Sequence, residues 1–164
     1  MKASGADEEE GLFRRSARVK TVKEVQSLYD DGLSVDFQSY GNPHLAAGIL
    51  KKFLRELQEP LMTFALFEAL TRVHYMEKDK QLAEVQRILQ DELPDDNYVV
   101  LKYVFQFLAQ VTAKAHINQM TADNVATVFG PNIAWPKGRK SLVCGTGSQV
   151  CLILIKSFDD VFLK

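Results

Sequence analysis

Two cations share one polar face of a predicted helix, and their chemistry suits an anionic partner. Segment 43–60 has apolar residues at helical spacing, and at about 100° per residue they fill one half of the helix. Lys51 and Arg55 fall on the other half, together with His44 and Gly48. A mid-helix glycine costs about 1 kcal/mol relative to alanine, so Gly48 among these charges predicts a place where another chain approaches. The alternative is a solvated face on which Arg55 pairs with an acidic residue one turn on.

Residues that could hold a metal or attack a substrate are poorly placed elsewhere in the chain. The three histidines show no ligand spacing, and no serine or cysteine has a recognisable base and acidic partner nearby. Cys144 and Cys151 lie seven apart without a histidine pattern, which predicts free thiols. Gly145 and Gly147 lack the context of a nucleotide-binding loop and predict a flexible loop. We therefore expect no metal or cofactor, and a free-standing hydrolase is disfavoured.

Length and composition predict one globular domain. The chain has 164 residues, of which 46% are hydrophobic and 25% charged, with a net charge of −1. This charge balance, without a basic and aromatic patch, argues against nucleic acid as a partner. Apolar runs are short and the start lacks a secretory signal, so we expect a cytoplasmic domain that does not insert into a membrane.

The apolar periodicity is helical nearly throughout, and no alternating run is long enough for a sheet, so we expect an all-α fold. The predicted helices are 21–31, 43–60, 61–75, 82–90, 95–111, 121–129 and 148–162. Helix 95–111 is the best candidate for the centre, on a surface formed by Val99, Leu101, Val104, Phe105, Phe107 and Leu108. Residues 1–10 are acidic and lack apolar anchors, so we expect a flexible leader before a helical domain at 11–164.

Three separated segments resemble, in order, the signature blocks of the Rho GTPase-activating protein (RhoGAP) domain. They are Gly-Leu-Phe-Arg-Arg-Ser-Ala at 11–17, Leu-Lys-Lys-Phe-Leu-Arg-Glu-Leu-Gln-Glu-Pro-Leu at 50–61, and Asn-Gln-Met-Thr-Ala-Asp-Asn-Val-Ala-Thr-Val-Phe-Gly-Pro-Asn at 118–132. The resemblance runs from Gly11 to the C-terminus and is nearest to small members of the family with an upstream Sec14-like module. It implies a helical bundle that binds GTP-loaded Rho-family small GTPases and accelerates GTP hydrolysis.

The resemblance also implies roles for individual residues. Arg14 matches the arginine finger, which stabilises the negative charge of the transferring phosphoryl group from outside the GTPase. Lys51 and Arg55 match positions that hold the finger loop and meet the switch regions of the GTPase, and Asn118 and Asn124 match positions expected to bind it. The partner GTPase would contribute the magnesium, the GTP and the glutamine that orients water.

Two departures from the family pattern leave an alternative open. Arg14 comes only a few residues after the start, so we expect part of the helices that lead into the finger loop to be missing, and Gln58 stands where the family usually has proline. A finger loop without support is mobile, and the entropy lost when it is ordered in the complex subtracts from the stabilisation of the transition state. The alternative is a noncatalytic module that binds a GTPase or acts as a scaffold. Neither reading specifies a Rho-, Rac- or Cdc-type partner.

Overall fold

The structure, a computed structural model, describes residues 5–138 and 145–162, and within these ranges all regular elements are helices. This confirms the all-α prediction. In chain order the elements are η1 (Ala6–Glu8), α1 (Val19–Asp30), α2 (Pro43–Glu56), α3 (Phe67–His74), α4 (Lys78–Asp91), α5 (Asp95–Ala113), α6 (Ala115–Asn118), α7 (Ala122–Phe129), η2 (Gly130–Asn132), α8 (Gly145–Lys156) and α9 (Phe158–Phe162).

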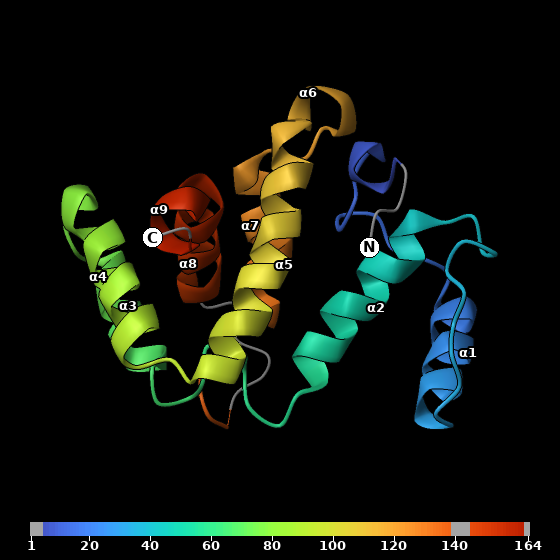
Figure 1. Cartoon of the computed structure of the whole chain (residues 1–164), viewed down its shortest axis with the longest axis horizontal. Coiled ribbons are helices and arrows are strands. Elements are labelled where there is room, and N and C mark those ends of the chain that lie inside the picture. Colours follow the sequence, from blue (N-terminus) through green and yellow to red (C-terminus); the bar gives the residue numbers. More distant parts are fainter. Residues whose placement is uncertain (1–4, 139–144, 163–164) are drawn as a thin grey trace.

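The long helix α5 stands in the middle of the molecule (Figure 1). Helices α7 and α8 pack against it and against each other, and the α3–α4 hairpin contacts α8 on one side. On the other side α2 and α1 pack together, and α2 also contacts η2. The segment that leads from η1 to α1 therefore lies on the α2 side, far from the α3–α4 hairpin (Figure 1).

The core is built largely on α5, as the sequence predicts. Leu101, Phe105 and Leu108 are fully buried, and the Phe105 ring lies 6.4 Å from that of Phe129 in α7. Val99 is an exception to the prediction, because it is 65% exposed and lies about 200° around the helix from Leu101. Phe53 in α2 is likewise 59% exposed and is about 100° from the buried Leu54.

The predicted helix at 61–75 is wrong in its first half. Only Phe67–His74 is helical, and the residues before it form a buried turn in which Thr63 has a φ of 59°. The Met62 N–H donates to the Ile133 carbonyl at 3.0 Å, and Asn97 Nδ2 donates to the Leu61 carbonyl at 2.8 Å. Partners from distant segments thus satisfy this backbone in place of helical hydrogen bonds.

Other helix ends also differ from the predictions. α1 begins at Val19 instead of residue 21, α2 ends at Glu56 instead of at Pro60, and α4 begins at Lys78 instead of 82. α6 is a short helix that was not predicted, and the single helix expected at 148–162 is instead two, α8 and α9. α7 agrees with the helix predicted at 121–129. Its start is capped by Thr121 Oγ1, which accepts from the Asn124 N–H at 3.2 Å.

Of the two glycines predicted to lie in a flexible loop, Gly147 has a packing role in the structure. Gly145 and Gly147 begin α8, so the flexible-loop prediction is wrong for them, and Cys144 lies outside the described residues. A Cβ on Gly147 would come 2.4 Å from the Gly130 carbonyl oxygen, so α8 and η2 approach as closely as their backbones allow. Cys151 is free and buried, and burial raises the pKa of its thiol.

Candidate functional site

The loop that carries Arg14 is anchored by its apolar residues. Leu12 and Phe13 are each 1% exposed, and the Phe13 ring makes edge contacts with Phe129 at 5.5 Å and Phe107 at 6.1 Å. Phe13 has a φ of 69°, an unusual value for a residue other than glycine. The loop is therefore fixed by the core directly before Arg14.

The turn at Gly11 directs the following arginines outward. The Gly11 carbonyl accepts from the N–H groups of Arg14 and Arg15, both at 2.9 Å. Arg15 folds back over Gly11 and pairs with Glu10 at 2.5 Å. Arg14 is exposed, and its side chain has no hydrogen bond or ion pair with any described residue. An exposed guanidinium on a fixed backbone can be offered to a partner.

Helix α2 supports this loop through Lys51. Its Nζ donates a hydrogen bond to the Phe13 carbonyl, which joins α2 to the residue before Arg14. Lys51 is partly buried, and its pKa is lowered first by burial and then by the positive charge of Arg55. The bond to a backbone carbonyl gives this ammonium a fixed place, which a solvated surface lysine lacks.

The outward face of α2 has room for another chain. Arg55 is exposed and forms no ion pair with a described residue, so the solvated alternative in which it pairs with Glu59 is not formed. Glu59 Oε1 instead accepts from the Phe64 N–H at 2.8 Å. A Cβ on Gly48 would meet nothing within 4 Å. Nothing in the described part of the chain therefore requires a glycine at this position.

Asn118 does not lie on the surface, which corrects the expectation that it contacts a partner. It is 0% exposed, and its Nδ2 donates to the carbonyls of Asp7 and Val111, both at 2.7 Å. Its Oδ1 accepts from the Met120 N–H at 2.7 Å, and its own carbonyl accepts from the Gly11 N–H at 2.8 Å. Asn118 thus fastens the segment before Arg14 to the junction of α5, α6 and α7.

Asn124 is partly exposed on the first turn of α7. Its backbone N–H is capped by Thr121, and its Nδ2 donates to the Gln119 carbonyl at 3.1 Å. Because the Asn124 side chain bonds within the domain through its nitrogen, its Oδ1 can accept a hydrogen bond from a partner. Of the five predicted site residues, Arg14 and Lys51 are joined through Phe13, and Asn118 holds the same loop through the Gly11 N–H. Within the described residues, the hydrogen bonds of Asn124 go to Thr121 and Gln119 and not to this loop.

The acidic residues before the loop are folded onto the domain, where the sequence predicts a flexible leader. Lys114 Nζ pairs with Asp7 at 2.7 Å and with Glu8 at 2.9 Å, which raises the pKa of Lys114. Glu9 lies 3.2 Å from His44 Nε2 in α2. Residues 5–10 therefore brace the loop that carries Arg14, and residues 1–4 lie outside the described part. In the sequence, the only signal for this bracing contact is the density of acidic residues.

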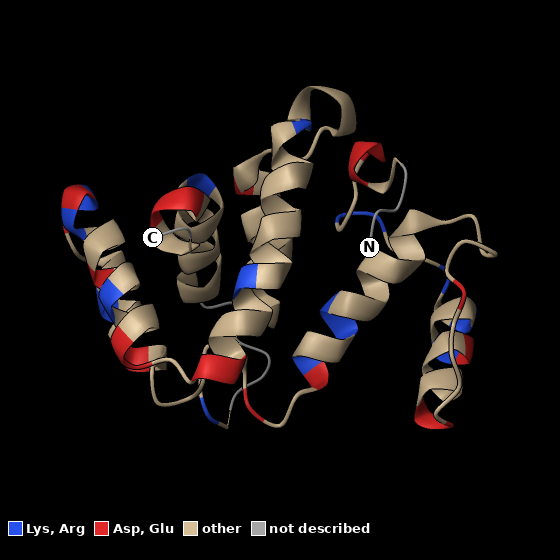
Figure 2. Cartoon of the chain, viewed as in Figure 1, with Lys and Arg blue, Asp and Glu red and all other residues tan. Residues whose placement is uncertain are grey.

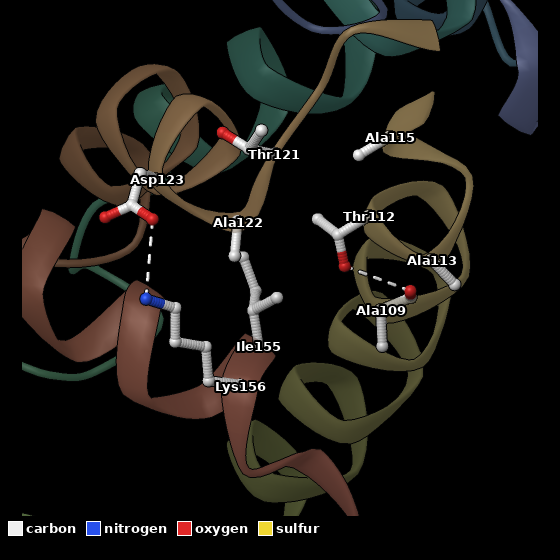
Figure 3. A pocket seen from close by; sticks show the side chains of 9 residues that line it. All are labelled: Ala109, Thr112, Ala113, Ala115, Thr121, Ala122, Asp123, Ile155 and Lys156. Atoms are coloured by element: carbon white, nitrogen blue, oxygen red, sulfur yellow. Dashed lines mark hydrogen bonds and ion pairs between the residues drawn. The ribbon is translucent and has the colours of Figure 1, made fainter. Parts of the chain in front are cut away.

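A shallow hollow elsewhere on the molecule carries little chemistry (Figure 3). It measures about 440 Å³ and is lined mainly by small side chains of α5 and α7 and by Ile155 and Lys156 of α8. Its charged groups, Asp123 and Lys156, pair with each other at 3.4 Å (Figure 3). None of the five predicted site residues lines it. The hollow does not resemble an active site, because it holds no nucleophile beside a base.

The described ranges hold neither a cluster of metal ligands nor a membrane-spanning helix. Within 5–138 and 145–162, no three or more His, Cys, Asp and Glu side chains are grouped in a way that could hold a metal ion. In the same ranges no helix combines the length and the apolar character needed to cross a membrane.

Comparisons with known proteins point to one family. The RhoGAP domain family matches residues 2–138. Rho GTPase-activating protein 8 of Mus musculus is 41% identical over 155 residues, which cover 94% of this chain and 35% of that protein. Rho GTPase-activating protein 1 of Homo sapiens is 46% identical over 128 residues, which cover 78% of this chain and 29% of that protein. The chain thus spans about a third of the length of these relatives.

Solved structures show the same fold. The crystal structure of human Rho GTPase activating protein 15 superposes with a TM-score of 0.87 at 23% identity, covering 98% of this chain and 78% of that one. The BH domain from Graf, the GTPase regulator associated with focal adhesion kinase, gives a TM-score of 0.83 at 24% identity, covering 99% of this chain and 88% of that one. At these identities the likeness establishes the architecture alone.

Proposed function

Because this chain belongs to the RhoGAP domain family, we propose that it binds GTP-loaded Rho-family small GTPases and accelerates their GTP hydrolysis by inserting Arg14 in trans. It is an activator of its partner's chemistry and has no reaction of its own. The observation that carries the proposal is the free, exposed guanidinium of Arg14 directly after a backbone that Phe13 anchors in the core. A cytoplasmic location, where such GTPases signal, belongs to the same proposal.

The chemistry asks for a positive group that is already in place when charge develops. As the terminal phosphoryl group is transferred, negative charge spreads over its oxygens, and a planar guanidinium with several donors stabilises it well. The GTPase supplies the magnesium, the nucleotide and the water-orienting glutamine, so this chain needs no cofactor. A finger of this kind lowers the barrier by roughly 4 to 7 kcal/mol.

The remaining site residues divide into two roles under this proposal. Lys51 and Asn118 are positioning residues, because they bind the backbone around Arg14 from α2 and from the α6–α7 junction. Fixing the loop in advance reduces the ordering entropy that a mobile finger would lose in the complex. Arg55 and Asn124 have exposed or partly exposed side chains and are the proposed contacts to the GTPase surface.

A single-turnover assay of GTP hydrolysis tests the proposal. The domain is added to GTP-loaded Rho-, Rac- and Cdc-type GTPases in turn, and Arg14→Ala and Arg14→Lys are compared with the wild type. We expect stimulation of at least one GTPase and a loss of about 10³-fold or more in Arg14→Ala. Arg14→Lys should rescue little, because an ammonium cannot reproduce the guanidinium geometry.

The same assay separates activation from binding. Binding measured on a GTP-analogue complex should survive Arg14→Ala and weaken in Arg55→Ala. A domain that binds a GTPase without any Arg14-dependent change in rate would be the noncatalytic module, and the finger mechanism would be wrong. A folded domain that neither binds nor stimulates any Rho-type GTPase would overturn the whole proposal.

A further inference from the structure

The chain after the finger is densely basic. Residues 14–23 contain five cations, Arg14, Arg15, Arg18, Lys20 and Lys23, and no acidic residue. Arg15 is paired with Glu10. The side chains of the other four are exposed and form no hydrogen bond or ion pair within the described residues. We call Arg18, Lys20 and Lys23, which lie at and just inside the start of α1, the basic strip (Figure 2).

The fold does not neutralise the basic strip. The acidic run just before it is engaged elsewhere, since Asp7 and Glu8 pair with Lys114 and Glu9 lies against His44. The first turn of α1 contains no acidic residue, and no side chain caps it. Cations are unfavourable at the positive end of a helix dipole. Glu24 follows Lys23 directly, but among the described residues none of the three cations forms an ion pair with it or with any other acidic residue. Three unpaired cations against one acidic neighbour indicate an anionic partner outside this chain.

The position of the basic strip beside Arg14 indicates which protein it contacts. Arg18 is four positions after Arg14, so their Cα atoms are at most about 14 Å apart. Lys20 and Lys23 are three positions apart and so share one face of α1. A protein that receives Arg14 in its nucleotide pocket therefore comes close to the start of α1, where the basic strip lies. The basic strip is therefore continuous with the proposed GTPase contact.

We infer that the basic strip binds acidic side chains on the rim of the GTPase, beside its nucleotide pocket, and speeds the encounter of the two proteins. This inference rests on the proposed function and extends its contact beyond the finger. Complementary charges that stay partly solvated raise association rates more than they change the chemical step. The basic strip should thus affect kcat/KM at low salt and leave the rate at saturation unchanged.

A matched pair of triple variants tests this. Arg18→Gln/Lys20→Gln/Lys23→Gln removes the basic strip. Arg72→Gln/Lys78→Gln/Lys80→Gln removes one arginine and two lysines from the exposed surface of α3 and α4, with the same change in net charge. At about 50 mM salt we expect kcat/KM of stimulated hydrolysis to fall about tenfold in the first variant and less than about twofold in the second. In about 0.5 M salt the two should converge.

The controls distinguish failure of this inference from failure of the proposed function. Wild-type stimulation that depends on Arg14, together with equal kcat/KM for the two triple variants at low salt, would overturn the basic strip alone. Absence of stimulation by the wild type would overturn the proposed function itself. Unchanged hydrolysis in solution combined with lost binding to phosphatidylserine vesicles would assign the strip to a membrane surface and refute the inference. Urea unfolding of both variants checks that they remain folded.

Discussion

Lysines and arginines lie on both sides of the molecule (Figure 2), but the two sides differ in whether arginines that could reach a partner are already paired. On the α3–α4 hairpin Arg72 pairs with Glu68 at 3.4 Å. Arg87 pairs with Glu84 in α4 and with Glu92 at the C-terminal end of α4, both at 2.7 Å. On the side of α1 and α2, Arg14 and Arg55 have no partner among the described residues. Exposed ion pairs contribute only about 0–1 kcal/mol each, so stability does not explain the difference. Arg15 and Lys52 on this side are paired, so it is the unpaired Arg14 and Arg55 that, under the proposed function, mark the surface for the GTPase.

The largest effect is expected at Asn118, which supports the finger side from within. Asn118→Ala removes an amide that serves Asp7, Val111 and Met120, and leaves buried backbone groups unpaired. We expect a loss of about 3 kcal/mol in the free energy of unfolding, measured by urea titration, and a large loss of stimulated GTP hydrolysis. Asn124→Ala is the matched control and should cost less than about 1 kcal/mol. Equal stability of the two variants would refute the tethering role.

A smaller and more selective effect is expected at Lys51. Lys51→Met keeps the apolar stem but removes the donor to the Phe13 carbonyl, so the loop that carries Arg14 loosens. We expect stimulated hydrolysis at saturating domain to fall about tenfold, equivalent to about 1.4 kcal/mol, with little change in stability. The control is Lys52→Met, whose ammonium pairs with Glu56 at 3.2 Å and should leave the rate unchanged. A rate loss shared by both variants would assign the effect to net charge.

The lowered pKa of Lys51 predicts a pH dependence with a definite sign. Burial disfavours its charged form in the folded state, whereas the unfolded chain titrates near 10.5. Between the lowered pKa and 10.5 the unfolded chain binds more protons, so the contribution of Lys51 to stability rises with pH. Urea unfolding of wild type and Lys51→Met between neutral pH and 10.5 should show the wild type gaining relative to the variant. A constant difference across this range would contradict the burial of the charge.

The fold was predictable where local periodicity and tertiary packing agree. The apolar stripe of α5 and the Thr121 cap of α7 are local signals, and both hold in the structure. The turn before α3 was not predictable, because Leu61 and Met62 continue a helical apolar pattern. Their backbone instead bonds to Asn97 and to Ile133, whose proximity only the folded chain creates.

The same distinction applies to the candidate site. The cationic face of α2 follows from residue spacing, and the resemblance to the family identified Arg14 as the finger candidate. Neither could reveal that Asn118 is buried, because its partners Asp7 and Val111 lie 111 and 7 residues away and meet only in the fold. The acidic start likewise looks solvated in sequence and becomes a brace once Lys114 and His44 are brought beside it.

The smallest effect is expected on the paired side, at Arg87. Arg87→Ala breaks its ion pairs with Glu84 and Glu92, which are screened by solvent, so the free energy of unfolding should change very little. Stimulated hydrolysis should be unchanged at every salt concentration, because Arg87 is already paired with glutamates of the same hairpin. The test is a salt series of kcat/KM beside the urea titration. A salt-dependent loss of kcat/KM in Arg87→Ala would mean that paired cations also guide the partner, and the contrast between the two sides would not hold.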